Sequence, residues 1–313
     1  MTTLVTGANG FLGKHLIRHI SENFPGEHIV GIGKEDFNFP QIESLTMDLT
    51  DQAAVARTVQ KFKPDRVYHL AGSARVQDDL GVPEYFAPNF LTTSMLISAL
   101  GKLAQPVSLF FTSSVHVYGN QTETVTENSQ VHPVSAYAFT KYLAEEALRM
   151  AIHTYPHLKV AVGRLYTCIG PDQSEGFVAA DLCRRIRELS DEKSAVLNVG
   201  SLSGYRSFLD VRDAMRIFPQ LLSRMAPNRF DVFNISSKNE LTIAEVLEIL
   251  LKISGKSPKI ECHEDQFPNR FKGLRVSVKK LEDTLGTLDF RPIDSTLRDM
   301  YEGSTKRSSN GQR

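Results

Sequence analysis

The stretch Thr3-Leu4-Val5-Thr6-Gly7-Ala8-Asn9-Gly10-Phe11-Leu12-Gly13 decides the fold of this chain. A short apolar run ends at the first glycine, and an amphipathic stretch follows directly. Glycines here allow a tight turn, let backbone N–H groups approach a pyrophosphate, and let a helix pack on a strand. The helix N-terminus adds partial positive charge. The turn predicts a dinucleotide site, although a purely structural turn has the same glycines. Its expected contacts are Gly7, Gly10, Phe11, Leu12 and Gly13.

Outward from this turn, short apolar runs alternate with amphipathic stretches. Strands are expected at residues 3–6, 28–32, 44–47, 66–70, 107–112 and 159–165, and helices at 11–21, 51–62, 89–103 and 136–154. This alternation predicts an α/β fold, a Rossmann-type doubly wound parallel sheet with helices on both faces. Strand 107–112 is apolar nearly throughout, as a strand covered on both faces should be.

After about Pro171 the pattern loosens. Helices are expected at 177–189, 211–223 and 242–253, and a strand at 230–235. We expect an NAD(P)-binding Rossmann domain over residues 1–170 and a smaller mixed α/β substrate-binding lobe over 171–302, with some segments interleaved with the first domain. The Ser-, Lys- and Arg-rich tail at 303–313 is expected to be disordered.

The composition limits the partners. Lys+Arg and Asp+Glu both number 36, so no basic surplus attracts nucleic acid or an anionic membrane. The three cysteines share no close spacing, which favours reduced thiols over a disulfide framework or a zinc site, and no metal is expected. No apolar run reaches the roughly 18 residues of a membrane helix. No signal peptide is expected, so the location predicted is cytoplasmic.

The residue that closes the second strand usually decides between NAD and NADP. An acidic residue there holds the ribose 2′-OH, and a basic residue accommodates a 2′-phosphate. Here Lys34 follows Gly33, which favours NADP, although Glu35 could hold a 2′-OH and the two could form a surface pair. Asp48, before Leu49, could accept a hydrogen bond from the adenine amino group. The alternative is that Asp48 or Thr50 caps a helix.

Tyr137 and Lys141 stand four residues apart on an expected helix, hence on one face. An ammonium beside a phenol lowers its pKa from near 10, which suits proton transfer to a carbonyl. An exposed helical pair is the alternative. Ser113 and Ser114 follow the fifth strand, where the carboxyl ends of parallel strands open onto the ligand crevice, so a serine hydroxyl can reach the same substrate oxygen.

These pieces together resemble the extended short-chain dehydrogenase/reductase (SDR) family of nucleotide-sugar epimerases, dehydratases and reductases. The matching segments are the glycine turn, residues 69–72 (His-Leu-Ala-Gly), Asn89, residues 113–119 and residues 137–141. The resemblance implies that Tyr137 donates a proton, that Lys141 lowers the Tyr137 pKa and binds the nicotinamide ribose, and that Ser114 is the third member, with Ser113 its neighbour. It also implies cofactor contacts at Leu70, Ala71 and Gly72, and a homodimer through helices 89–103 and 136–154.

Branches of this family differ just after the catalytic hydroxyl. Sugar 4,6-dehydratases carry an Asp-Glu pair there, whereas this chain has Val115 and His116, which argues against a dehydratase. Epimerase-reductases similar to GDP-fucose synthase keep a Cys where His116 stands. His116 could act as an acid or base on the substrate, or serve as a packing or hydrogen-bonding residue.

Residues 163–178 resemble the stretch Arg-x-Phe-Asn-x-x-Gly-Pro-Gly-Gln-Ser-x-x-Phe-Val of GDP-4-keto-6-deoxy-D-mannose reductases. The resemblance places Phe177 and Val178 at the substrate, with Thr167 in place of the family's Asn. It implies that Arg206 binds the nucleotide diphosphate, for which a guanidinium fork is suited. Arg270 could substitute for an Arg that the family carries nearby.

The sequence thus predicts a reductase that uses NADP, with NAD as the alternative, and acts on a nucleotide-diphosphate sugar. Hydride would go to C4 of a 4-keto-6-deoxyhexose, with the tyrosine as proton donor. Two alternatives stay open: a nucleotide-sugar 4-epimerase with tightly bound NAD, and a non-catalytic SDR-like protein that binds a dinucleotide as a sensor.

Overall fold

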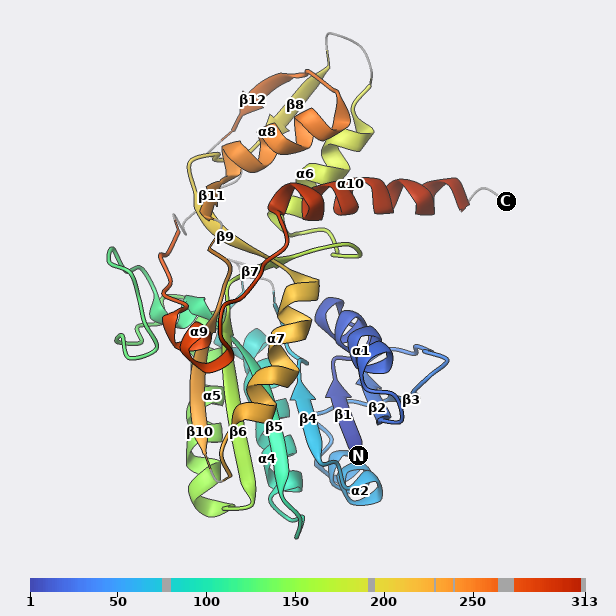
Figure 1. Cartoon of the computed structure of the whole chain (residues 1–313), viewed down its shortest axis with the longest axis vertical. Helices are drawn as coiled ribbons and strands as arrows, with labels where there is room; N and C mark the ends of the chain where they lie inside the picture. Colours follow the sequence, from blue (N-terminus) through green and yellow to red (C-terminus); the bar gives the residue numbers. More distant parts are fainter. Residues whose placement is uncertain (75–79, 191–194, 228, 239, 264–272, 311–313) are drawn as a thin grey trace.

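The computed structural model describes residues 1–74, 80–190, 195–227, 229–238, 240–263 and 273–310. Its central strands are β1 (Thr2–Thr6), β2 (His28–Gly33), β3 (Glu43–Thr46), β4 (Arg66–His69), β5 (Val107–Ser114), β6 (Leu158–Leu165) and β10 (Phe230–Ile235). They form one seven-stranded sheet in the order β10-β6-β5-β4-β1-β2-β3, and every neighbouring pair is parallel (Figure 1). The chain reverses its direction of winding between β1 and β4. The predicted Rossmann-type fold is confirmed.

Helices cover both faces of this sheet. One face carries α1 (Phe11–Asn23), α7 (Val211–Arg224) and α9 (Lys279–Leu285), and the other carries α2 (Gln52–Phe62), α4 (Thr92–Leu100) and α5 (Ala136–Thr154). Successive residues of one strand serve the two faces, as the pleat requires. Phe110 stacks on Phe218 of α7 with ring centroids 4.2 Å apart, while Phe111 packs in the opposite core. Burial on both sides explains the apolar runs in the sequence.

The helix expected at 89–103 has a different start. It begins as α3 (Val82–Tyr85), continues through a π-helical turn, η1 (Phe86–Leu91), and only then becomes α4. Pro83 suits the first turn of a helix, and Pro88 lacks the N–H that a regular turn would use. Asn89 is buried within η1, and its Nδ2 donates to Thr140 Oγ1 of α5 at 3.1 Å. The π-helical turn therefore presents Asn89 to α5.

A second lobe stands beyond the carboxyl ends of the central strands (Figure 1). Its elements are α6 (Val178–Glu188), α8 (Ile243–Ser254), α10 (Ile293–Asn310), the pair β8 (Val196–Val199) and β12 (Lys259–Cys262), and the three-stranded sheet of β7 (Thr167–Ile169), β9 (Tyr205–Asp210) and β11 (Glu240–Thr242). It has its own apolar core. Strand β10 and helix α7 come from the second half of the chain but complete the first domain. The chain therefore crosses between the lobes more than once.

Helix α10 continues to Asn310, although the composition of residues 303–313 predicts a disordered tail. No proline interrupts this segment. Within the ranges given above, no helix is both long and apolar enough to cross a bilayer.

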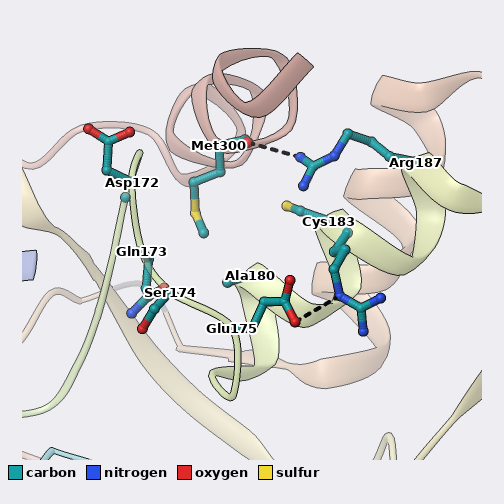
Figure 2. Close-up of a pocket in the computed structure, with 10 residues that line it drawn as sticks. Asp172, Gln173, Ser174, Glu175, Ala180, Cys183, Arg187 and Met300 are labelled. Carbon is teal, nitrogen blue, oxygen red and sulfur yellow. Dashed lines mark hydrogen bonds and ion pairs between the residues drawn. The ribbon is translucent and has the colours of Figure 1, made fainter. Parts of the chain in front are cut away.

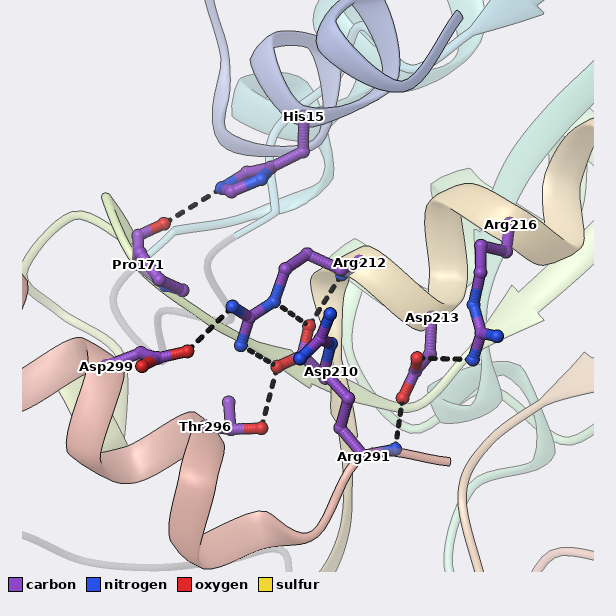
Figure 3. A network of polar contacts seen from close by, with 9 residues as sticks. All are labelled: His15, Pro171, Asp210, Arg212, Asp213, Arg216, Arg291, Thr296 and Asp299. Carbon is purple, nitrogen blue, oxygen red and sulfur yellow. Dashed lines mark hydrogen bonds and ion pairs between the residues drawn. The ribbon is translucent and has the colours of Figure 1, made fainter. Parts of the chain in front are cut away.

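A polar network joins the two lobes where β9 runs into α7 (Figure 3). Asp210 caps α7, accepting hydrogen bonds from the Arg212 backbone N–H at 2.7 Å and from its Nη2 at 2.6 Å. From α10, Thr296 Oγ1 donates to Asp210 at 2.6 Å, and Asp299 accepts from Arg212 Nη1 at 2.7 Å. We call these four residues the lobe-junction network. It holds α10 against the first domain.

Candidate active site

A cavity of about 720 Å³ lies where the carboxyl ends of the central strands meet the second lobe. Gly7 after β1, Leu70 after β4 and Ser114 at the end of β5 contribute to its wall. This is the crevice that doubly wound sheets use for ligands. Of the residues predicted from the sequence, those lining it are Gly7, Gly10, Phe11, Leu12, Gly13, Leu70, Gly72, Ser113, Ser114, His116, Tyr137, Lys141, Thr167, Phe177 and Arg206.

The glycine turn has the shape that a pyrophosphate needs. Gly7 has φ 69°, and a Cβ there would lie 2.8 Å from the Ala71 backbone nitrogen. A Cβ on Gly13 would collide with the Gly7 carbonyl oxygen. Helix α1 starts after Gly10 with no side-chain cap and no acidic residue in its first turn. The backbone N–H groups at its N-terminus are therefore open to an anion in the cavity, and this part of the chain fits a dinucleotide.

The residues expected at the adenosine end lie outside this cavity. Lys34 and Asp48 are exposed at the ends of β2 and β3, and Lys34 is close enough to influence the Asp48 carboxylate. Asp48 Oδ1 accepts from the Thr50 backbone N–H at 2.9 Å and from its hydroxyl at 2.8 Å, and these bonds lower the Asp48 pKa. Asp48 thus stabilises a turn in the structure, while Asp51 caps α2 by accepting from Ala54 N at 3.0 Å.

Three other predicted residues, all within the described ranges, are not brought to the cavity wall. Leu49 is buried in the core, and Val178 packs in the core of the second lobe. Ala71 lies behind Gly7, where its backbone N–H donates to Thr6 Oγ1 at 3.3 Å. Arg270 lies outside the described residues.

Tyr137 and Ser114 meet inside the cavity. Ser114 hydrogen-bonds the Tyr137 side chain, and its Oγ also accepts from the His116 backbone N–H at 3.2 Å. Ser113 is its neighbour in the strand, but its hydroxyl points the other way and donates to Glu145. The alternation of side chains along β5 therefore selects Ser114 as the hydroxyl beside the phenol.

Contrary to the expectation from the sequence, the pKa of Tyr137 is raised. Tyr137 is only 7% exposed, and burial raises its pKa to about 12, against the opposing effect of the Ser114 hydrogen bond. Desolvation of the phenolate outweighs any help from nearby positive charge. At neutral pH the phenol is protonated and can donate.

Lys141 lies one helical turn after Tyr137, as predicted, and its side chain is buried. Its Nζ donates to the Thr112 carbonyl oxygen at 3.0 Å and lies 5.1 Å from the centre of the Phe111 ring. Burial lowers the pKa of Lys141 to about 8, and the Glu145 carboxylate opposes this shift. Lys141 is therefore still largely charged at neutral pH.

His116 lies close to the Tyr137 phenol, and Arg206 lies close enough to His116 to influence its charge. The His116 ring meets the Tyr137 ring edge-on, with centroids 6.1 Å apart. Burial lowers the pKa of His116 to about 4, and the charge of Arg206 acts in the same direction. His116 is thus neutral at neutral pH and suited to hydrogen bonding. Among the described residues, Lys141 and Arg206 are the cationic side chains on the cavity wall and no carboxylate lines it, which favours an anionic ligand.

Several residues of the cavity wall were not predicted from the sequence. Ser135 is one whose position could have been found, because it caps α5 by accepting from Ala138 N at 3.2 Å, two residues before Tyr137. No sequence pattern near Tyr166 predicts its place in the site. Its hydroxyl accepts a hydrogen bond at 2.8 Å from the backbone N–H of Leu274, a residue far from it in the sequence. The complete set is Ser73, Ala74, Thr112, Asn120, Val134, Ser135, Leu165, Tyr166, Cys168, Gln173, Ser174 and Gly176.

A second cavity of about 350 Å³ lies between the loop after β7, helix α6 and helix α10 (Figure 2). Its arginines already have partners in the protein. Arg184 binds Glu188 at 2.6 Å, and Arg187 Nη1 donates to the Met300 carbonyl oxygen at 3.4 Å. Its charges therefore do not point to a ligand. In the part of the chain that the structure covers, no cluster of three or more His, Cys, Asp or Glu could hold a metal ion.

Comparison with known proteins agrees with this geometry. The model of the NAD dependent epimerase/dehydratase family matches residues 3–236. The chain is 30% identical, over 94% of each protein, to GDP-6-deoxy-D-mannose reductase from Pseudomonas aeruginosa. It is 25% identical to GDP-6-deoxy-D-talose 4-dehydrogenase from Aggregatibacter actinomycetemcomitans, over 96% of this chain and 97% of that protein.

A solved structure supports the same assignment. RMD from Pseudomonas aeruginosa, complexed with NADPH, superposes with a TM-score of 0.84 at 27% identity, covering 98% of this chain and 99% of that one. The matching segment includes the glycine turn, the serine that ends β5 and the Tyr–Lys pair on α5. The chain therefore belongs to the NAD-dependent epimerase/dehydratase family, the extended branch of the short-chain dehydrogenases/reductases.

Proposed function

We propose that this chain is an NAD(P)H-dependent reductase that transfers hydride to C4 of a nucleotide-linked 4-keto-6-deoxyhexose. The proposal is carried by one observation, the meeting of Ser114, Tyr137 and Lys141 in a cavity that also contains the glycine turn. The 30% identity to a GDP-6-deoxy-D-mannose reductase supports the choice of reaction.

In this proposal, Tyr137 donates its proton to the carbonyl oxygen, because burial keeps the phenol protonated. Ser114 hydrogen-bonds the same oxygen and fixes its position. When bound, the nicotinamide supplies the hydride. Lys141 holds the ribose and stabilises the negative charge that Tyr137 acquires as its proton leaves.

We propose NADP as the preferred cofactor and NAD as the second choice. The backbone of Gly10, Phe11 and Leu12 would hold the pyrophosphate at the start of α1. Lys34 is exposed at the end of β2, where a 2′-phosphate could meet it. The NADPH bound to the structurally similar RMD supports this preference.

For the substrate, Arg206 would bind the diphosphate, with Phe177 and Thr167 beside the nucleotide sugar. The wall of the cavity, as far as the structure describes it, carries positive side chains and no carboxylate, which suits a nucleotide diphosphate. A thermal-shift screen of GDP-, dTDP-, CDP- and UDP-sugars with NADPH or NADH identifies the nucleotide, because a ligand that binds only the folded state raises Tm.

The main alternative is a 4-epimerase, since the same three side chains serve a reversible oxidation at C4. The test is the balance of cofactor in a reaction with the nucleotide sugar found by the screen. Stoichiometric oxidation of NADPH supports the reductase. Interconversion of two sugars with a tightly bound cofactor and no net NADPH oxidation contradicts it, and so does cofactor binding without any turnover, which would indicate a sensor.

We also propose a homodimer. The side chains of Phe86 in η1 and of Phe139 and Met150 in α5 are 38%, 42% and 70% exposed, an apolar surface that a second copy could cover. Light scattering of the wild type and of Phe139→Glu tests this, with a dimer expected for the first and a monomer for the second. The cysteines at 168, 183 and 262 are free thiols, which favours a reducing compartment such as the cytoplasm.

A further inference from the structure

A buried ion pair lies directly behind the proposed catalytic groups. Glu145 of α5 and Arg164 of β6 have side chains that are 0% and 3% exposed. Arg164 Nε lies 3.1 and 3.2 Å from the two carboxylate oxygens of Glu145, and its Nη2 donates to Oε2 at 2.7 Å. The Ser113 hydroxyl donates to the same carboxylate. The Glu145–Arg164 pair therefore ties β5 and β6 to the catalytic helix.

The pair is close in sequence and in space to two catalytic groups. Glu145 follows Lys141 by four residues on α5, so the two side chains share one face of the helix, one turn apart. Ser113, which binds Glu145, directly precedes Ser114 in β5. A change at Glu145 can thus reach both the ammonium and the serine hydroxyl that lines the cavity.

Few other charges act on Lys141. His69 of β4 lies near Lys141, but burial lowers its pKa to about 3, so it is neutral. Tyr137 on the same helix is neutral as well, because burial raises its pKa to about 12. Among the charged side chains of the described residues, Glu145 is the one that acts on Lys141. The Glu145 carboxylate therefore binds Arg164 directly and attracts the Lys141 ammonium.

Burial disfavours the charged form of Lys141, and the neighbouring Glu145 carboxylate favours it. We propose that Glu145 is a positioning residue: it keeps the Lys141 side chain an ammonium ion and holds the end of β5, with Ser114, against α5. This inference rests on the proposed function, since the charge of Lys141 matters there for binding the ribose of the cofactor.

The test measures the dissociation constant for NADPH as a function of pH, from the fluorescence of bound NADPH, together with thermal unfolding. In the wild type, affinity should weaken as pH rises through about 8, where Lys141 loses its proton. In Glu145→Gln the weakening should begin about one pH unit lower, because the attraction of the Glu145 carboxylate for the ammonium is lost. In Arg164→Met it should begin at higher pH, because Glu145 is left to attract the ammonium.

These opposite shifts separate positioning from stability. Both variants break the same buried pair and both should unfold at lower temperature, so a merely structural role predicts NADPH curves that are unshifted or shifted alike. Either result would overturn the inference. The double variant Glu145→Gln/Arg164→Met removes both charges, and its curve should lie between those of the single variants.

Glu145→Asp is the conservative control. It also provides a measurement at this position if Glu145→Gln does not fold. It keeps the charge with a shorter side chain, so its pH curve should stay near that of the wild type even though Tm falls. A curve shifted to lower pH in Glu145→Asp contradicts the inference. A wild type that binds NADPH but reduces no sugar would overturn the proposed function instead. The pH curves for NADPH binding would still test the role of Glu145.

Discussion

Two acid–arginine networks in this molecule are built from the same chemistry but meet solvent differently. The Glu145–Arg164 pair lies inside the first domain, with both side chains at most 3% exposed. In the lobe-junction network Asp210 is buried, but Arg212 and Asp299 are 31% and 39% exposed. The first network lies beside the proposed catalytic groups, and the second connects α7 to α10.

The difference indicates separate roles. A fully buried charge depends on its partner, because no water can take the partner's place. Removing one member of such a pair therefore changes the electrostatic environment of any other buried charge beside it, which here is the Lys141 ammonium. Water can partly take the place of a partner in the more exposed Arg212–Asp299 pair. Removing Arg212 should therefore weaken the contact between the lobes without changing the charge of Lys141.

The largest expected effect comes from removing the arginine in each network. Arg164→Met should lower the free energy of unfolding by about 3 to 5 kcal/mol, since the buried Glu145 carboxylate loses the guanidinium that donates its hydrogen bonds. Arg212→Met should cost about 1 to 2 kcal/mol, because the Thr296 hydroxyl and the backbone N–H of residue 212 still donate to Asp210. Urea unfolding at neutral pH measures both. Equal losses, or a larger loss for Arg212→Met, would show that exposure does not separate the two networks.

An intermediate effect is expected at Lys141, because the buried ammonium that would bind the cofactor lowers the stability of the fold. Its pKa is lowered from 10.5 to about 8, so the unfolded state binds more protons between those values and wild-type stability should rise with pH there. Below about pH 8 the cost of burying the ammonium is fully present. Lys141→Met removes this cost and should be about 1 to 3 kcal/mol more stable at neutral pH, while binding NADPH more weakly.

The measurement is urea unfolding of the wild type and Lys141→Met at several pH values. The advantage of the variant should shrink as pH rises from about 8 to 10.5. An advantage that stays constant with pH would mean that the ammonium is not the source of the cost.

The smallest effect separates the two neighbouring serines of β5. Ser114→Ala should lower kcat about tenfold to a hundredfold, since one hydrogen bond to the reacting oxygen is lost. Ser113→Ala should lower kcat less and instead cost about 1 kcal/mol of stability, because its hydroxyl binds Glu145. Steady-state kinetics and urea unfolding of both variants measure these effects. A larger fall in kcat for Ser113→Ala would reverse the assignment of the two hydroxyls.

Much of the fold could be predicted because its signals are local. The glycine turn, the apolar strands and the four-residue spacing of Tyr137 and Lys141 each follow from neighbouring residues, and the structure places them as predicted. The serine next to Tyr137 could be narrowed to two candidates. Only the pleat of β5, fixed by its pairing with β4 and β6, selects Ser114.

Other features depend on contacts that no local pattern contains. The partners Glu145 and Arg164 lie on different elements and meet only when β6 packs against α5. The pKa of Tyr137 was predicted in the wrong direction because burial is a property of the assembled lobes. The start predicted for the helix at 89–103 is wrong. Pro83 stands in the first turn of α3 and Pro88 within the π-helical turn η1, so the helical segment begins earlier.

The proposed chemistry depends above all on proton donation by the Tyr137 phenol, which Tyr137→Phe removes without changing the shape of the side chain. We expect kcat for NADPH-dependent reduction of the 4-keto sugar nucleotide to fall by a factor of about a hundred or more, while the dissociation constant for NADPH stays nearly unchanged. A Tyr137→Phe variant that reduces the sugar as fast as the wild type would contradict the proposed mechanism.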